Sequence, residues 1–201
     1  MNIYLIRHGE KADDDKNHEL IELTAKGFRQ ADLLGLRLKR YSIDKIYASS
    51  MKRAIQTAEG INRHLGVEII IRPELQEINM GACNIGGWAN LEKNYPEFIR
   101  EHEKHEKDLR YPPDGENGGD VWNRASKIIE EIAHSNLENV AVVTHGGVIR
   151  ATICGLLKIS QTRRFYMGNP PQNCSISVIK YDRTNNEFIL HSFNDYAHLE
   201  A

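Results

Sequence analysis

The chain has 201 residues, of which 40% are apolar and 27% are charged, and this is enough material for one hydrophobic core. Its formal net charge of -2, with acidic and basic residues mixed along the chain, lacks the strong field that would attract a nucleic-acid backbone or an anionic membrane. We therefore expect a single domain over residues 1–201 and neither a nucleic acid nor a membrane as partner.

Predicted strands and helices alternate from the start of the chain. Residues 3–6 form a continuously apolar, β-branched run, which is typical of a strand covered by helices on both faces. Apolar residues at helical spacing over 28–38, behind Thr24, predict the first helix. Residues 43–48 are then expected to form the second strand.

The most regular helical pattern covers residues 51–65. Its apolar side chains fall on one face, and Ser50 is available as the N-cap. Residues 67–71 follow as a strand that Pro73 ends.

The middle of the chain is less regular. Apolar residues over 91–98 predict a helix that runs on into the charged and exposed stretch 101–108. The proline- and glycine-rich segment 111–119 must be a loop, and loops of this composition often border a site. Helical spacing resumes over 122–132, behind Asp120.

The last third of the chain begins with another apolar, β-branched run at 140–143, which we expect, like the first strand, to lie centrally in a sheet. A helix over 148–157 follows it. Residues 176–178 and 188–193, joined by a turn at 182–186, predict an edge hairpin. The whole pattern predicts an α/β fold, a three-layer α/β/α sandwich with a mostly parallel central sheet and an antiparallel edge.

The cysteines and the N-terminus bear on the cellular compartment. Cys83, Cys154 and Cys174 are an odd number at unrelated spacings, which predicts free thiols in a reducing compartment. The N-terminus shows no basic region followed by a long apolar stretch. We therefore expect a cytoplasmic protein.

Two of the predicted strands end in a histidine followed by glycine, at His8 and His145. In an open α/β sheet, ligands bind beyond the carboxyl ends of the strands, where glycine lets backbone and ligand approach closely. Arg7 precedes the first histidine, and Arg53 begins a helix directly after a strand. Because guanidinium groups match phosphate oxygens, these side chains predict a phosphate pocket.

Gly146 and Gly147 lead from His145 into the helix predicted over 148–157. Its first amide groups are unpaired donors with partial positive charge, so we expect them to favour an anion as well. Taken singly, a histidine after a strand is usually structural, and Arg53 or Glu77 would usually lie at the surface. They favour a functional site only because the predicted fold brings all of them to the same edge of the sheet.

Several blocks of the sequence, in the expected order, resemble the motifs of the histidine phosphatase superfamily, also called phosphoglycerate mutase-like. The most specific block reads Ser-x-x-x-Arg-Ala-x-Gln-Thr-Ala from Ser49, and another is the Arg-His-Gly signature. The likeness covers most of the chain, over residues 7–10, 23–27, 49–58, 75–78 and 144–147.

The resemblance implies roles for these residues. His8 would be the nucleophile that forms a phosphohistidine, and Glu77 would protonate the leaving oxygen and later activate the attacking water. His145 would complete the catalytic set, and it would bind the phosphoryl group together with Arg7 and Arg53. The physics agrees, because imidazole attacks only when neutral and nearby arginine charges disfavour its cationic form.

The resemblance thus implies a phosphomonoesterase, a histidine acid phosphatase-type phosphoric monoester hydrolase that acts on a small phosphorylated metabolite. Neither a metal nor another cofactor is expected. The expected partner is a small phosphate ester, and the oligomeric state stays open, with a homodimer as one option.

A phosphoglycerate mutase is the first alternative. This alternative is weakened because Lys11, in front of the acidic run 13–15, stands where the mutase branch carries threonine or serine.

The chain departs from the small phosphatases of the superfamily as well. Residues 83–85 lengthen the stretch between Gly81 and Gly87 relative to those phosphatases.

Two alternatives come from other classes. A non-catalytic binder of phosphorylated ligands would need no titratable acid and nucleophile, which His8 and Glu77 supply. A metal site could use His8, His145, or the pair His102 and His105, although the charge run around that pair favours solvated histidines.

Other polar residues have weaker indications of function. Lys11, Arg110 and Asn173 are candidate substrate contacts, and each is more typical of a surface or loop position. Residues 115–117 and Arg124 resemble a further family motif, and we assign them no catalytic role.

Overall fold

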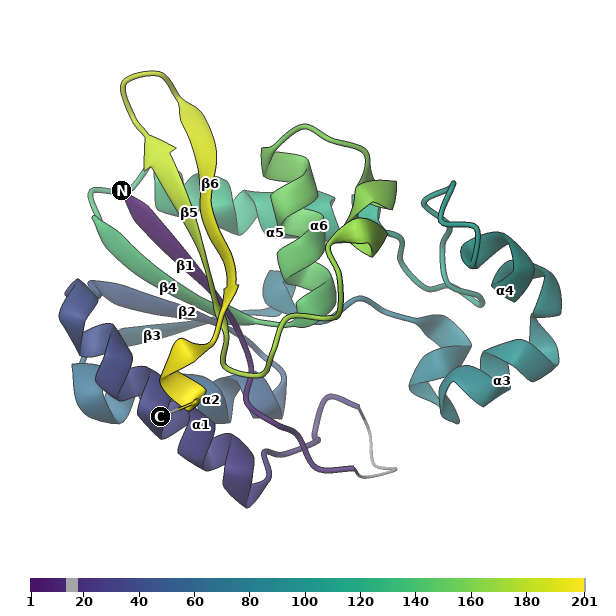
Figure 1. Cartoon of the computed structure of the whole chain (residues 1–201), viewed down its shortest axis with the longest axis horizontal. Helices are drawn as coiled ribbons and strands as arrows, with labels where there is room; N and C mark the ends of the chain where they lie inside the picture. Colours follow the sequence, from purple (N-terminus) through teal and green to yellow (C-terminus); the bar gives the residue numbers. More distant parts are fainter. Residues whose placement is uncertain (14–17, 201) are drawn as a thin grey trace.

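The computed structural model describes residues 1–13 and 18–200 (Figure 1). Within the acidic run 13–15, Asp14 and Asp15 lie outside the described residues. A six-stranded sheet runs through the molecule in the order β3-β2-β4-β1-β5-β6. Its strands are β1 (Asn2–Arg7), β2 (Lys45–Ser49), β3 (Glu68–Arg72), β4 (Asn139–Thr144), β5 (Ile176–Asp182) and β6 (Glu187–Asp195).

The two apolar, β-branched runs form the central strands β1 and β4, as predicted, and the structure shows that these two strands are neighbours. They pair in parallel, with Ile3 opposite Val140 and Ile6 opposite Val143, and all four residues are buried. Strands β2 and β3 continue the parallel part of the sheet. Strands β5 and β6 form the predicted antiparallel edge.

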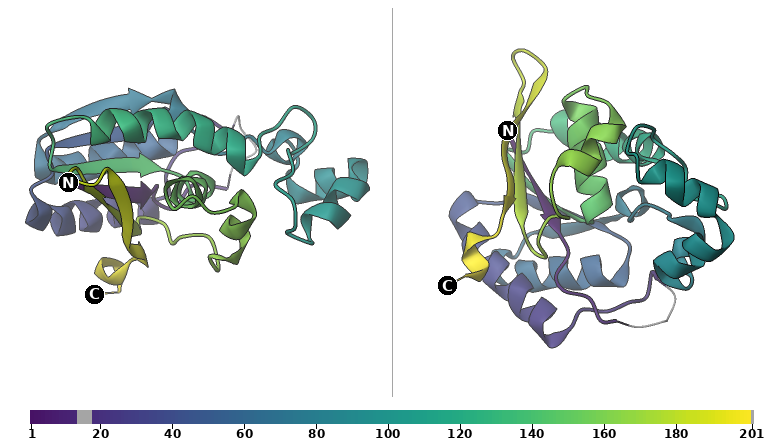
Figure 2. Two further views of the ribbon diagram at one scale, coloured as in Figure 1. Left: turned by 90° about the horizontal axis from the view of Figure 1, so that it is seen from above. Right: turned by 45° about the vertical axis from the view of Figure 1, so that its right-hand side comes forward.

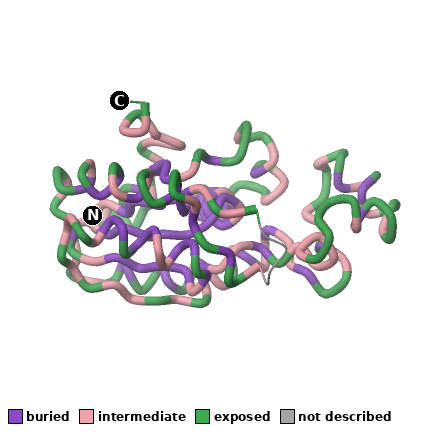
Figure 3. The backbone as a smooth tube through the Cα atoms, turned by 90° about the horizontal axis from the view of Figure 1, so that it is seen from below, coloured by how far each residue is buried: buried purple, intermediate pink, exposed green. Residues whose placement is uncertain are grey.

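Helices cover both faces of this sheet (Figure 2). Helices α1 (Ala25–Leu38) and α2 (Lys52–Leu65) pack against one face. Helices α5 (Gly118–Ala133) and α6 (Gly146–Leu156) pack against the other face. Buried residues therefore concentrate along the sheet and the inner sides of these helices (Figure 3), which confirms the three-layer α/β/α sandwich.

Helix starts were predicted with mixed success. Thr24 caps α1 as expected, because its side chain accepts the Gly27 amide. The expectation for Ser50 is wrong, since Met51 is the N-cap of α2 and the Ser50 hydroxyl accepts a hydrogen bond from Gln76.

Helix α5 begins earlier than its apolar spacing indicates. Its N-cap is Asn117, whose side chain accepts the Asp120 amide, while the Asp120 side chain accepts the Asn117 amide. This reciprocal capping box draws one more turn into the helix, because it satisfies two otherwise unpaired donors.

The middle of the chain projects beyond the sheet as two short helices, α3 (Gly87–Asn94) and α4 (Pro96–His102), where a single helix was predicted (Figure 1). Pro96 lacks an amide donor and begins the second helix, and Tyr95 between them is not helical. The helix also ends at His102 instead of running through the charged stretch. The 3-10 segments are η1 (Lys39–Tyr41), η2 (Pro73–Leu75), η3 (Gly81–Asn84), η4 (Gln161–Tyr166) and η5 (Ala197–Leu199).

Cys83, Cys154 and Cys174 are free thiols, and the latter two are buried. None of the helices in the described part of the chain is both long and apolar enough to cross a membrane.

Candidate active site

The fold brings His8 and His145 together. Strands β1 and β4 are parallel neighbours, with Arg7 opposite Thr144, so the two histidines that follow them emerge at the same edge of the sheet. Their ring centroids are 5.0 Å apart. The predicted convergence at the carboxyl ends of the strands is therefore present in the structure.

The hydrogen bonds of His8 define its tautomer. Its Nδ1 lies 2.7 Å from the Gly9 carbonyl oxygen, and its Nε2 accepts a 3.2 Å hydrogen bond from Arg53 Nε. Because a carbonyl oxygen only accepts, the proton is on Nδ1 and Nε2 keeps its lone pair. Burial, followed by the charge of Arg53, holds the pKa of His8 well below its usual range, so the ring is neutral.

Arg53 is held in place at every guanidinium nitrogen. It is 1% exposed, and besides His8 it donates to the His18 carbonyl at 2.8 Å and to Met51 Sδ at 3.1 Å. Burial lowers the pKa of Arg53 to about 10, which still leaves it cationic at neutral pH. A fixed positive charge therefore lies against the neutral imidazole.

Arg7, the last residue of β1, is positioned by the loop that precedes β5. Its guanidinium donates to the Pro171 carbonyl at 2.5 Å, and Asn173 donates to the His8 carbonyl at 2.9 Å. The Arg7 Nε is buried and has no partner among the described residues. Arg7 thus keeps a donor that a ligand oxygen could use.

His145 is fully buried beside His8. Its Nε2 lies 2.8 Å from the Ser49 hydroxyl, whereas its Nδ1 has no hydrogen-bond partner in the part of the chain that the structure describes. Burial, followed by the charges of His8 and Arg53, places the pKa of His145 well below its ordinary value. Sequence reasoning missed Ser49 as a partner, although it is the first residue of the most specific motif.

Glu77 approaches the same rim from the segment after β3. Its carboxylate accepts the Ile78 amide at 2.9 Å and the Gly147 amide at 3.3 Å. The α6 amide that was expected to favour an external anion therefore holds this carboxylate. A Cβ on Gly147 would lie 2.6 Å from Glu77 Oε1, so glycine makes room for the side chain.

Arg124 fixes the segment that carries Glu77. Its guanidinium donates to the carbonyl oxygens of Glu74 and Glu77, at 2.6 and 3.3 Å. It also makes a bidentate pair with Glu116 at 2.7 and 2.9 Å, and Glu116 in turn accepts the Asn79 amide. The motif made of residues 115–117 and Arg124 thus supports the site from outside.

Gly9 has a packing role that the sequence did not predict. A Cβ there would lie 2.7 Å from the Gly27 carbonyl oxygen, and a Cβ on Gly27 would lie 2.2 Å from the Glu10 carbonyl oxygen. The two glycines therefore allow the segment that follows β1 to pack tightly on the first turn of α1.

The candidates with weaker indications lie outside the group formed by His8, Arg53 and His145, or support it from outside. Lys11 is exposed, although its charge contributes to the low pKa of His8, and Arg110 pairs with Asp120 at 2.5 Å. His102 is buried against Tyr111, so the expectation of a solvated histidine is wrong there. No group of three or more histidine, cysteine or acidic side chains in the described ranges could hold a metal ion.

The sequence profile of the histidine phosphatase superfamily (branch 1) matches residues 3–195. The chain belongs to this superfamily. It is 30% identical to phosphoserine phosphatase 1 of Hydrogenobacter thermophilus over 194 residues, which cover 92% of this chain and 89% of that relative.

Other members of the histidine phosphatase superfamily resemble the chain over its full length. The probable phosphoglycerate mutase GpmB of Escherichia fergusonii is 29% identical over 216 residues, which cover 100% of this chain and 96% of that one. The solved structure of Bacillus stearothermophilus YhfR matches with a TM-score of 0.85 and 26% identity over 98% of each chain. The chain is therefore an enzyme of the histidine phosphatase superfamily, with an α/β fold shared with its solved members.

Proposed function

We propose that the chain is a phosphomonoesterase of the histidine acid phosphatase type, which hydrolyses a small phosphorylated metabolite through a phosphohistidine on His8. The observation that carries this proposal is the unprotonated Nε2 of His8, which is buried and surrounded by Arg7, Arg53 and His145. Such a neutral nucleophile within a cationic, water-poor pocket is what attack on a phosphate dianion requires.

In the first step, His8 Nε2 forms a bond to phosphorus while the bond from phosphorus to the ester oxygen breaks. Arg7 and Arg53 hold the equatorial oxygens, whose charge must be stabilised during transfer. The protonated Glu77 gives its proton to the leaving alcohol.

In the second step, the Glu77 carboxylate takes a proton from water, whose oxygen attacks phosphorus. The bond from phosphorus to His8 Nε2 breaks, inorganic phosphate leaves, and both residues return to their starting states.

His145 supplies a further donor in this proposal. We assign the Ser49 hydroxyl, 2.8 Å from His145 Nε2, as the donor of this hydrogen bond, which puts the ring proton on the Nδ1 that has no partner among the described residues. This nitrogen is available to an equatorial phosphoryl oxygen without the ring becoming cationic.

The test that separates hydrolysis from its alternatives measures two products. With p-nitrophenyl phosphate and a panel of phosphorylated metabolites, including phosphoserine, we expect release of inorganic phosphate that a chelator does not suppress. With 3-phosphoglycerate and a bisphosphoglycerate primer, we expect no 2-phospho product. Formation of that product would favour the mutase, and absence of any turnover would favour a non-catalytic binder.

A further inference from the structure

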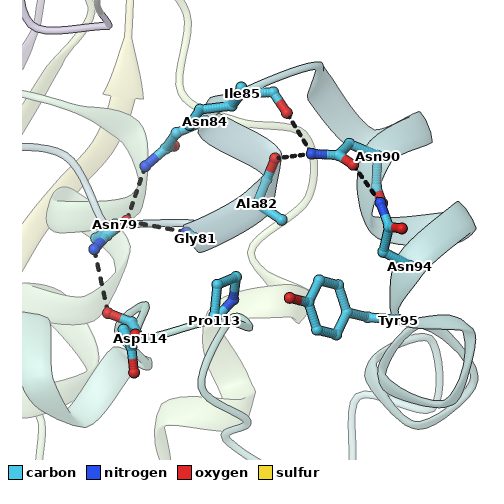
Figure 4. Close-up of a pocket in the computed structure, with 10 residues that line it drawn as sticks. All are labelled: Asn79, Gly81, Ala82, Asn84, Ile85, Asn90, Asn94, Tyr95, Pro113 and Asp114. Atoms are coloured by element: carbon cyan, nitrogen blue, oxygen red, sulfur yellow. Dashed lines mark hydrogen bonds between the residues drawn. The ribbon is translucent and has the colours of Figure 1, made fainter.

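A cavity of about 760 Å³ lies in the projecting part of the molecule, two residues along the chain from Glu77 (Figure 4). Its walls are the segment from Asn79 through η3, helix α3 and the loop at Pro113 and Asp114. The cavity has the size of a small-molecule site. The residues 83–85 that lengthen this stretch contribute Asn84 and Ile85 to its lining.

Close backbone contacts fix the shape of this cavity. A Cβ on Gly81 would lie 2.4 Å from the Pro112 carbonyl oxygen, and the Ala82 amide donates to that same oxygen at 2.9 Å. A Cβ on Gly115 would lie 2.7 Å from the Asn79 carbonyl oxygen. The two segments that form these walls are therefore in close contact through the backbone of the two glycines.

Four of the lining residues carry carboxamide side chains, and no lining residue is a lysine or arginine. Asn79 accepts from the Asn84 side chain at 2.8 Å, and Asn90 donates to the carbonyl oxygens of Ala82 and Ile85 at 3.0 and 2.6 Å. Asn94 donates to Asn90 (Figure 4). These bonds hold the amides in fixed orientations before any ligand arrives.

Among the lining residues, Asn84 Oδ1 is buried and accepts no hydrogen bond from the described part of the chain. The Tyr95 hydroxyl points toward Pro113 across the cavity (Figure 4). Leaving a buried acceptor unsatisfied is unfavourable, so a hydrogen-bond donor on a ligand would be stabilising here.

We propose that this cavity binds an uncharged, hydroxyl-rich molecule, a sugar or polyol. Carboxamides and phenols each donate and accept hydrogen bonds, as hydroxyl groups do. The Asp114 carboxylate is the single charge among the lining residues, and it disfavours a second anionic group on the ligand. The ligand is either the alcohol part of the phosphate ester, in which case the inference rests on the proposed function, or a separate polyol.

Two matched substrates test whether the ligand is the alcohol part of the phosphate ester. Glucose 6-phosphate and hexyl phosphate both release a primary alcohol, and only the former carries hydroxyls. We expect a higher kcat/KM for glucose 6-phosphate. Tyr95→Phe should lower that value by about 3- to 10-fold, since it removes one hydrogen-bonding hydroxyl group. It should not change the value for hexyl phosphate or p-nitrophenyl phosphate.

Tyr166→Phe is the matched control, because Tyr166 is 64% exposed and does not line the cavity. It should leave all three kcat/KM values unchanged. Hydrolysis of p-nitrophenyl phosphate reports on the proposed function by itself, so a failure of the catalytic account is distinguishable from a failure of this inference.

Free glucose and sorbitol test whether the ligand is a separate polyol. If a separate polyol is the ligand, either compound should raise the midpoint of thermal unfolding of the wild-type chain, and Tyr95→Phe should reduce this shift. Either the substrate preference or the thermal shift, each sensitive to Tyr95→Phe, supports the proposal. The absence of both, or the same effects in Tyr166→Phe, overturns it.

Discussion

Arg53 Nε donates a 3.2 Å hydrogen bond to His8 Nε2 at the buried centre of the site. The same arginine is tied to His18 and Met51, so it cannot move away without breaking these contacts. This geometry keeps the lone pair of His8 directed at a cationic group and opposes protonation of the ring. Arg53 thus adds to the effect of burial in lowering the pKa of His8, and in our proposal the same side chain also binds the phosphoryl group.

Replacing Arg53 by lysine keeps the charge and removes the planar fork. We expect Arg53→Lys to lower kcat/KM for p-nitrophenyl phosphate by about 100-fold, because aligned donors at the phosphoryl group are lost. Arg63→Lys, on the exposed side of the same helix, is the control and should retain full activity. Equal activity in both variants would contradict the role given to Arg53.

The low pKa of His8 predicts a pH profile. Since burial and then the Arg53 charge lower this pKa well below 6.5, the nucleophile should stay neutral into the acid range, and kcat/KM should persist there. Arg53→Met removes a charge that disfavours the imidazolium form, so the acidic limb should move to higher pH. The substrate also titrates in this region, and the difference between the two profiles is therefore the measurement. Superimposable limbs would count against the electrostatic coupling.

The loss of rate on replacing Glu77 should increase with the basicity of the leaving group. We expect Glu77→Gln to slow hydrolysis of alkyl phosphates by about 100-fold or more and to affect p-nitrophenyl phosphate much less, since p-nitrophenolate needs little protonation. Glu92→Gln, at an exposed position of α3, is the control. Equal losses on both kinds of substrate would remove the acid role.

The sequence predicted the parts of the site that follow from strand ends and motifs. His8, Arg53 and His145 are brought together because parallel strands end at one edge of the sheet. The Ser49 contact to His145 and the Arg124 support of Glu77 were not predicted. They depend on side-chain hydrogen bonds between segments distant in sequence, which periodicity does not encode.

The errors in the fold have similar local causes. Ser50 and Asn117 are both typical N-cap residues, and only the positions of Gln76 and Asp120 determine which of them caps a helix. His102 lies in a charged run, yet it is buried because the chain turns its ring toward Tyr111 and Phe165. The charge of neighbouring residues alone could not show this.

Burial of His102 predicts a stability effect. Burial lowers the pKa of His102 from 6.5 to about 4, so between these values the unfolded chain binds a proton that the folded chain does not. The contribution of the neutral His102 to the free energy of unfolding is therefore complete above pH 6.5. Below that pH the free energy of unfolding falls, by about 1.4 kcal/mol per pH unit. His102→Gln should weaken the pH dependence of the free energy of unfolding, measured with urea at about pH 7.5 and about pH 5.

His134→Gln provides the comparison for this experiment, because His134 is an exposed histidine at the end of α5. It should leave the difference between the two pH values unchanged. A His102→Gln variant with the same pH dependence as the wild type would show that His102 is not the group responsible.

The most direct test of the account is to locate the phosphoryl group during turnover. Acid-labile phosphate should be trapped by alkaline quenching of the enzyme with substrate and mapped by mass spectrometry to the peptide that contains His8. His8→Asn should show neither this adduct nor hydrolysis of p-nitrophenyl phosphate. A phosphorylated residue other than His8, or unchanged turnover in His8→Asn, would contradict the proposal.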